Sequence, residues 1–173
     1  VHTLSIHQAN MFPAGYGGLA DRGEGAGTGA NTNLPLPAGC GHEAYLHAMR
    51  RIGLPLIRDV RPDVIIIANG LDANHVDPLA RMSCTSATFA EMTAMVMRAA
   101  DEVCDGRVVA MHEGGYSEAY VPFCGHRVVE GLAGIETGLC DPFLAKFMEQ
   151  QPSPDHAAWQ CAEIDRMASA LGF

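Results

Sequence analysis

The chain has 173 residues, enough for one domain with a sizeable core, and its 48 % hydrophobic content is ordinary for a globular protein. A formal net charge of −9 argues against a nucleic-acid-binding surface, because phosphate contacts need clustered Lys and Arg. The sequence has no signal peptide, no apolar run near 20 residues and no Cys-x-x-Cys pair among its six cysteines. We therefore expect a cytoplasmic protein with free thiols and no membrane partner.

The first part of the chain reads as a strand followed by a long loop. Residues 1–7 have a strand pattern that begins abruptly, so a preceding segment is expected. Residues 9–31 form a long glycine-rich loop, and loops of this length are usually functional or disordered. Gly25, Gly27 and Ala30 have dinucleotide-motif spacing, but that motif must open a helix. The sequence NLPLP follows it and cannot do so, so we reject a dinucleotide site.

The middle of the chain predicts a helix followed by a buried strand. Residues 41–60 place apolar side chains three and four positions apart, and Pro55 should kink or end this helix. Residues 64–68 are an unbroken apolar run of the kind that suits a strand buried on both faces in a parallel sheet. The strand–helix–strand order predicts parallel pairing with a right-handed crossover.

Further helices and one further strand complete the prediction. Thr85 or Ser86 can cap a helix whose apolar stripe ends at Val103. Pro122 and Gly134 suit the first turn and the end of another helix. Trp159, Ile164 and Met167 are expected to dock the last helix on the body. The remaining predicted elements are a strand at 106–111 and helices at 120–132, 141–148 and 155–171.

Two strand ends carry the candidate functional groups. Asp72 follows the strand at 64–68, at the edge where ligands collect in open α/β sheets. With little water nearby its carboxylate needs a cation, a metal or several donors, although an acid there also commonly caps a turn. After the strand at 106–111, Gly114 and Gly115 permit a sharp turn that directs Tyr116 into a cleft.

Several stretches in one order resemble a known family. The segments LSIHQ, MFPAGYG, NTNLPLPAGCG, NGLDANHVDPL and HEGGYSEAYVPFCG are similar to zinc-dependent histone deacetylases, especially bacterial class II-like members that include acetylpolyamine amidohydrolases. The resemblance covers about residues 1–141. It implies an α/β arginase/deacetylase fold, a three-layer αβα arrangement with a mainly parallel central sheet. Residues 1–173 would then be the C-terminal part of a single deacetylase domain.

The resemblance implies hydrolysis of the acetamide of an acetylated lysine, polyamine or similar primary amine. Asp72 matches one of two aspartates that, with a histidine, hold one divalent metal, which is Zn²⁺ with Fe²⁺ as the alternative. Tyr116 matches the tyrosine that donates to the oxyanion. Gly114 and Gly115 match the turn that shapes the substrate tunnel.

The resemblance also assigns residues away from the chemistry. Phe12 matches an aromatic wall of the tunnel, although a lone aromatic is more often a core anchor. Leu79 matches a lining position at the tunnel mouth, beside Asp77, for which we favour a turn-capping role at the following proline. Ser5 and Ile6 match positions that bind a structural monovalent cation such as K⁺, and a simple strand-end hydrogen bond for Ser5 is the alternative.

The remaining metal ligands of the family are absent. These 173 residues contain no His-His pair and no Asp-x-His, so this span alone is predicted to be inactive and to bind zinc weakly. The alternative is a non-catalytic fragment or scaffold module that keeps the fold, but such a module needs neither Asp72 nor Tyr116. The expected partner is a small acetylated amine or an acetyl-lysine, which an acidic surface would attract. A homo-oligomer stays open.

Overall fold

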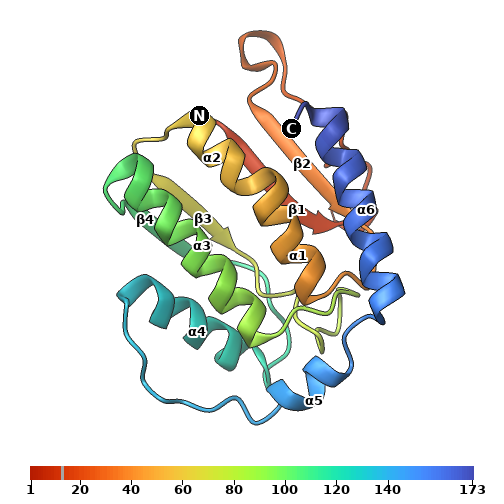
Figure 1. Ribbon diagram of the computed structural model, residues 1–173, viewed down its shortest axis with the longest axis vertical. Coiled ribbons are helices and arrows are strands. Elements are labelled where there is room, and N and C mark those ends of the chain that lie inside the picture. The colour runs from red at the N-terminus through yellow and green to blue at the C-terminus, as the bar shows by residue number, and fades with distance from the viewer. Residues whose placement is uncertain (13) are drawn as a thin grey trace.

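A computed structural model describes residues 1–12 and 14–173, and it alternates strands with helices (Figure 1). This alternation agrees with the α/β class predicted from the sequence. The elements in chain order are β1 (Thr3–Gln8), the 3₁₀ turn η1 (Gly25–Gly27), β2 (Asn31–Leu36), α1 (His42–Ala48), the π-helical η2 (Met49–Gly53), α2 (Leu54–Val60), β3 (Ile65–Asn69), α3 (Ser86–Cys104), β4 (Val108–His112), α4 (Val121–Ala133), α5 (Leu144–Glu149) and α6 (Pro154–Leu171).

The strands pair in parallel, as the sequence predicted. β1 pairs with β2, and β3 pairs with β4. β2 was not predicted, because the sequence analysis used the NLPLP segment only to exclude a helix. Pro35 of β2 has no N–H to donate to a neighbouring strand. In the structure β2 has one described neighbour, β1, so Pro35 lies in an edge strand, where a missing donor is tolerated. Leu34 and Leu36 of β2 are fully buried and supply the apolar contacts that hold it.

The predicted helix at 41–60 is a continuous helical run with an irregular centre. α1, η2 and α2 follow one another without a loop, and η2 is a π-helical turn immediately before α2. Pro55 lies in the first turn of α2, and its missing N–H falls where the π-helical turn η2 already interrupts the regular α-helical hydrogen bonds. The irregularity that the sequence placed at Pro55 therefore lies in the preceding turn.

The ends of α3 and α4 follow the predicted signals. Thr85 caps α3 in a capping box with Thr88. Pro122 stands in the first turn of α4, and Gly134 ends it with a φ of 65°. The two helices pack on each other, and Phe89 of α3 and Val128 of α4 are buried in the same hydrophobic core. These local signals therefore set the ends of both helices.

The last helix docks through Ile164 and Met167, as expected, but not through Trp159. Gln160, Ile164 and Ala168 are buried at four-residue steps, which place them on one side of α6. Trp159 precedes that stripe by one position and is 45 % exposed, so the expectation that it docks the helix is wrong. Instead, the Gln160 side-chain amide donates to the carbonyl of Gly39 at 3.0 Å and ties α6 to the start of α1.

One face of the β3–β4 sheet is open. Helices α1, α2 and α3 lie on the viewer's side of the strands in Figure 1. Ile66 is 65 % exposed, and Val109 and Met111 of β4 are exposed as well. The expectation that β3 is buried on both faces is therefore wrong for this chain, because the described residues cover only one side of the pair. Alternate side chains along a strand point to opposite faces, which accounts for the pattern.

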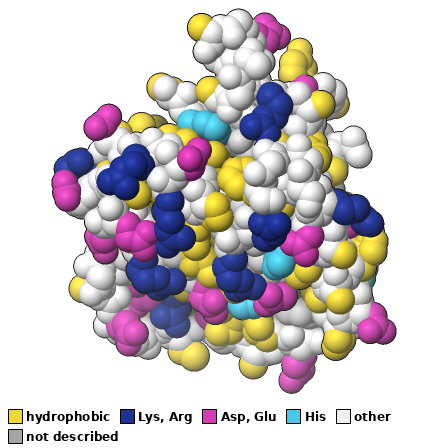
Figure 2. Space-filling view, turned by 45° about the horizontal axis from the view of Figure 1, so that its top comes forward, with side chains coloured by type: hydrophobic (Ala, Val, Ile, Leu, Met, Phe, Trp, Pro, Cys, Tyr) yellow, Lys and Arg dark blue, Asp and Glu magenta, His cyan; other side chains and the backbone are white. Residues whose placement is uncertain are grey.

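The outer surface mixes both signs of charge. Figure 2 shows Lys and Arg interspersed with Asp and Glu over one face of the molecule. Arg58 and Glu102, for example, form a two-bond ion pair between α2 and α3. All six cysteines are free, and four of them are buried. Among the described residues, no helix combines the length and the apolar character needed to cross a membrane.

Candidate functional site

The C-terminal ends of β3 and β4 lie side by side. The ladder closes with Asn69 opposite His112, and beyond it the Leu71 N–H donates to the Gly114 carbonyl at 2.7 Å. Asp72 follows Leu71 in the sequence, and its carboxylate lies against Gly114. A Cβ on Gly114 would lie 2.5 Å from the Asp72 Oδ2, so a side chain there would displace this carboxylate. The strand ends thus bring together two residues that are 42 positions apart in the sequence.

The turn that presents Tyr116 depends on Gly115. Gly115 has a φ of +127°, a conformation that other residues rarely adopt. A Cβ there would lie 2.9 Å from the Leu71 Cβ and 3.0 Å from the Val121 Cγ2. Leu71 is fully buried, so it cannot move aside easily. The turn leaves Tyr116 53 % exposed after the end of β4, and the cleft into which the sequence directs it stays a prediction.

The surroundings of Asp72 disfavour its negative charge. The side chain is half-buried, and desolvation raises the pKa of its carboxyl above the usual range. Its own backbone N–H lowers the pKa, the charge of Asp77 raises it, and the Ala73 N–H lowers it by less. No cation contributes to this balance among the described residues. A positive charge beside Asp72 would therefore stabilise its ionised form.

The described residues do not form a metal centre by themselves. None of their His, Cys, Asp and Glu side chains gather in a group of three. His75, the nearest histidine in sequence to Asp72, instead contacts the Gln150 Oε1 at 3.0 Å through its Nε2 and packs against Phe147. Asp72 offers one donor, which is fewer than zinc or iron requires. Residues 1–12 and 14–173 therefore do not fit a divalent metal alone.

Asp77 connects the loop after β3 to the turn after β4. Its Oδ1 accepts the N–H groups of Leu79 at 2.9 Å and Ala80 at 3.0 Å, which confirms the predicted turn cap. Its Oδ2 accepts the Tyr116 N–H at 2.9 Å, a contact that the sequence did not indicate. Asp77 is only 8 % exposed, whereas Leu79 is 53 % exposed. The buried acid thus holds the backbone beneath two exposed side chains.

The remaining predicted site residues lie in and after β1. Phe12 is 88 % exposed, so the alternative that it anchors the loop in the core is wrong. The Ser5 hydroxyl is 2.7 Å from the His7 Nδ1, and the His7 Nε2 is 3.0 Å from the Gly17 carbonyl. Ile6 is partly buried against the core. The strand hydrogen bond of Ser5 is therefore present, while a cation role for Ser5 and Ile6 stays a prediction.

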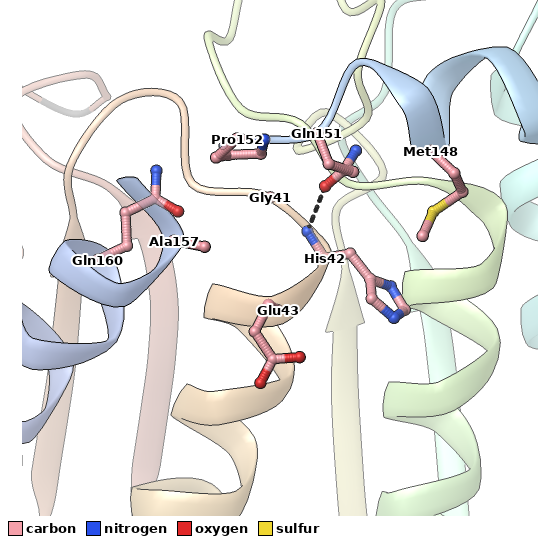
Figure 3. Close-up of a pocket in the computed structure, with 8 residues that line it drawn as sticks. All are labelled: Gly41, His42, Glu43, Met148, Gln151, Pro152, Ala157 and Gln160. Atoms are coloured by element: carbon pink, nitrogen blue, oxygen red, sulfur yellow. Dashed lines mark hydrogen bonds between the residues drawn. The ribbon is translucent and has the colours of Figure 1, made fainter. Parts of the chain in front are cut away.

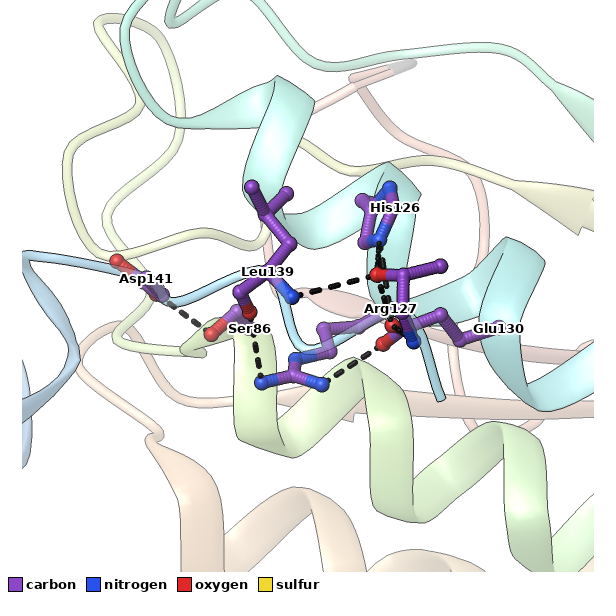
Figure 4. A network of polar contacts seen from close by, with 7 residues as sticks. Ser86, His126, Arg127, Glu130, Leu139 and Asp141 are labelled. Carbon is purple, nitrogen blue, oxygen red and sulfur yellow. Dashed lines mark hydrogen bonds and ion pairs between the residues drawn. The ribbon is translucent and has the colours of Figure 1, made fainter. Parts of the chain in front are cut away.

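A buried polar cluster supports the start of α4, a few residues after Tyr116. The Tyr120 hydroxyl donates to the Asp141 Oδ2 and accepts the Ser86 N–H, each at 3.0 Å. The Ser86 hydroxyl donates to the same Asp141 oxygen at 2.6 Å (Figure 4). Burial raises the pKa of Tyr120 well above its usual value, so this phenol stays protonated and serves as a donor. Sequence reasoning missed this cluster because its members lie on three separate segments.

A second polar cluster closes the far end of α4 (Figure 4). The Glu130 carboxylate accepts the side-chain hydroxyl and the N–H of Thr137, at 2.6 and 2.7 Å. Arg127 adds a hydrogen bond at 2.7 Å. The Thr137 hydroxyl, the Thr137 N–H and Arg127 together lower the pKa of Glu130 to about 2. Glu130 is therefore ionised at neutral pH and ties the loop after α4 back to the helix.

Two hollows lie away from the strand ends. One of about 170 Å³ lies between the start of α1 and the segment joining α5 to α6 (Figure 3). There the His42 N–H donates to the Gln151 Oε1 at 2.8 Å, which already satisfies this end of α1. The other, about 290 Å³, lies beside Arg127 and Glu130. Neither of these two hollows is lined by Asp72 or Tyr116.

Comparison with known proteins decides the family. Residues 1–132 match the Histone deacetylase domain. The chain belongs to the histone deacetylase family. A histone deacetylase-like amidohydrolase of Pseudomonas aeruginosa is 49 % identical over 174 residues, which include all of this chain and 46 % of the relative. The Acetoin utilization protein AcuC of Bacillus subtilis is 33 % identical over 92 % of this chain and 42 % of its own length. This chain of the histone deacetylase family therefore spans less than half of these relatives.

Solved structures agree with this assignment. The histone deacetylase Clr3 matches 97 % of this deacetylase-family chain and 27 % of its own, with a TM-score of 0.76 and 27 % identity. The HDA15 HD domain matches 96 % of this chain and 44 % of its own, with a TM-score of 0.74 and 26 % identity. The predicted α/β deacetylase-like fold is thereby confirmed.

Proposed function

We propose that the protein containing this chain is a metal-dependent deacetylase that hydrolyses the acetamide of an acetylated lysine, polyamine or similar primary amine. One observation carries the proposal. Asp72 and the Gly-Gly-Tyr turn stand at neighbouring strand ends, with Gly114 packed so closely on the carboxylate that a side chain there would displace it. The similarity to an amidohydrolase at 49 % identity supports the same reaction class.

In this proposal Tyr116 donates a hydrogen bond to the acetamide oxygen as that oxygen gains negative charge. A half-exposed phenol on a rigid turn suits such a donor, because it is held in place before the reaction begins. The Gly115 conformation directs the side chain, and the N–H of Tyr116 is bound by Asp77. The hydroxyl itself is left to reach the substrate.

Asp72 is proposed as one donor to a divalent metal, zinc with iron(II) as the alternative. Desolvation already disfavours its charge, and a cation would relieve that penalty. Because the described residues hold no group of three metal-binding side chains, the other donors would come from outside these 173 residues. We therefore propose that residues 1–173 are the C-terminal part of one deacetylase domain and are inactive alone.

Leu79 and Phe12 are proposed to line the path by which the acyl group reaches Tyr116. Both are large, apolar and exposed, which suits a surface that contacts an alkyl chain. A net charge of −9 would attract cationic amines, whether free polyamines or lysine-rich segments. We keep a structural K⁺ at Ser5 and Ile6 as part of the proposal.

A non-catalytic interaction module is the second candidate. The exposed apolar face formed by Ile66, Val109 and Met111 favours it, because such faces mark surfaces that contact other polypeptide. The same face is also expected if the remaining part of a longer deacetylase covers it. The two candidates differ in whether Asp72 holds metal and whether the full-length protein releases acetate.

The test is metal content and acetate release in the full-length protein. Elemental analysis should find about one zinc or iron per chain, with hydrolysis of an acetyl-lysine peptide or an acetylated diamine. Asp72→Ala should lose the metal and the activity, whereas Asp63→Ala, an exposed acid before β3, should keep both. Full metal occupancy in Asp72→Ala would remove it from the ligand set. An inactive, metal-free wild type would favour the interaction module.

A further inference from the structure

We infer that Asp77 is a positioning residue that fixes the backbone of Tyr116 and couples it to the turn carrying Leu79, an inference whose kinetic part rests on the proposed deacetylase function. The two carboxylate oxygens of Asp77 bind two different segments of the chain. Oδ1 accepts the N–H groups of Leu79 and Ala80, and Oδ2 accepts the N–H of Tyr116. One acid therefore ties together two segments that are 39 residues apart.

The burial of Asp77 makes these bonds strong. The residue is 8 % exposed, so water competes weakly for its oxygens. A buried carboxylate is expensive to hold without partners, and three N–H donors supply them here. Hydrogen bonds to an ionised acceptor are roughly twice as strong as neutral ones. The arrangement therefore resists movement of either segment.

The geometry of the turn shows why Tyr116 needs this anchor. Gly114 and Gly115 have no side chains, so backbone contacts must fix the turn. The Leu71 N–H holds the Gly114 carbonyl at 2.7 Å on one side of Gly115. On the other side the Asp77 carboxylate holds the N–H of Tyr116 at 2.9 Å. The two bonds together fix the direction in which the phenol leaves the turn.

The loop between these two anchors is rigid in its own right. Asn74 is fully buried, and its side-chain amide donates to the Leu71 carbonyl at 2.7 Å. Its Oδ1 accepts the Val76 N–H at 3.1 Å. The path from Leu71 to Asp77 is therefore braced along its length, so Tyr116 is positioned relative to Asp72 and not only relative to Asp77.

The coupling predicts a defined kinetic effect. A displacement of about 1 Å at a catalytic group can lower a rate about a hundredfold. Loss of Asp77 should therefore lower kcat through Tyr116, while substrate affinity changes less. If Tyr116 is already phenylalanine, there is no hydroxyl to misplace, and loss of Asp77 should have little further effect on kcat.

The experiment is a double-mutant cycle in the full-length protein with an acetyl-lysine peptide as substrate. Asp77→Ala should lower kcat at least tenfold in the wild type and less than about twofold in Tyr116→Phe, with KM changed less than about threefold. Asp77→Asn, which keeps one acceptor oxygen, should fall between Asp77→Ala and wild type. An equal loss of kcat in both backgrounds would overturn the inference, because the effect would then not pass through Tyr116.

Asp141→Asn is the matched control. Asp141 is also 8 % exposed and also accepts an N–H two residues on, from Phe143 at 2.8 Å, but it contacts Tyr120 in place of Tyr116. Whatever it does to kcat should be the same in the wild-type and Tyr116→Phe backgrounds. A dependence on residue 116 as large as that of Asp77 would show that general loosening, not positioning, explains the cycle.

Amide hydrogen exchange separates this inference from the proposed function. In Asp77→Ala the Tyr116 N–H should exchange at least tenfold faster, while the Leu71 N–H changes little, because its acceptor is Gly114. If wild type releases no acetate but this exchange pattern holds, the proposed function fails and the anchoring stands. Unchanged exchange at Tyr116 overturns the anchoring even in an active enzyme. Asp77→Asn serves in the same measurement if Asp77→Ala does not fold.

Discussion

Two regions at the C-terminal ends of β3 and β4 differ in how completely this chain forms them. We call the buried residues under the strand ends the support, and the half-buried Asp72 with the exposed Tyr116 the edge. Beneath, Leu71, Tyr120 and Asp141 are buried, and the polar groups among them are hydrogen-bonded. Above, Asp72 is half-buried without a cation, and Tyr116 is 53 % exposed. This chain therefore builds the platform for the site in full but leaves the reactive edge open.

The open β3–β4 face extends the same contrast. Exposed apolar side chains on one face of a parallel pair are unusual, since parallel sheets are normally covered on both sides. The relatives are more than twice as long as the aligned region. We propose that the remainder of the full-length protein covers this face and completes the edge. The following predictions test whether changes at the edge affect activity while changes in the support affect stability.

Tyr116→Phe should produce the largest effect. It removes only the hydroxyl, which makes no hydrogen bond in the described part of the chain, so stability should stay within about 0.5 kcal/mol of wild type. In the full-length protein kcat should fall roughly a hundredfold or more, because a donor to developing charge is lost. Thermal unfolding and steady-state kinetics check the two halves of this prediction. Near-normal turnover would show that Tyr116 does not act on the reacting oxygen.

Gly115→Ala should lower the stability of the fold where the Tyr116 turn packs on the buried Leu71. The positive φ is unfavourable for alanine, and the new Cβ would lie 2.9 Å from the Leu71 Cβ. We expect a loss of about 1–3 kcal/mol in unfolding free energy, measured by urea titration. Gly138→Ala is the control, since Gly138 has a φ of +77° but open space around it. An equal loss at both positions would mean that backbone conformation alone, without packing on Leu71, sets the effect.

Glu130, which lies at the far end of α4 from the Asp72 edge, should make the stability of the fold fall at acid pH. Its folded pKa of about 2 lies below the ordinary value of 4.5, so its contribution is present above pH 4.5 and is lost as pH falls toward 2. Glu130→Gln should therefore show a smaller fall in the urea midpoint between pH 5 and pH 3 than wild type. The exposed Glu136, changed to Gln, should leave that fall nearly unchanged. An identical pH dependence in Glu130→Gln and wild type would contradict the assignment.

Ile66→Thr should have the smallest effect on stability. Ile66 is 65 % exposed, and threonine keeps the β-branched shape, so the change should be within about 0.5 kcal/mol. If the open face is adhesive, the isolated chain should associate less after this change, as sedimentation velocity can show. Val129→Thr is the control, because Val129 is similarly exposed but belongs to α4 and not to β3 or β4. Equal reductions in association would indicate that no single face is responsible.

Local signals in the sequence determined most of the element order and the positions of the main candidates. Thr85 and Gly134 mark helix ends because caps depend on neighbouring backbone groups. Asp72 and Tyr116 were expected at strand ends because each follows an apolar run, and parallel pairing was expected from the strand–helix–strand order, which β3 and β4 confirm. These inferences need no knowledge of distant contacts.

Only the tertiary structure decided the features that depend on what lies against them. β2 forms despite Pro35 because β1 and the core hold it at an edge, and Trp159 stays outside because α6 docks through the adjacent stripe. Asp77 reaches Tyr116 across 39 residues, a contact that no local pattern encodes. Burial and long-range hydrogen bonds belong to pairs of surfaces, so a single stretch of sequence cannot specify them.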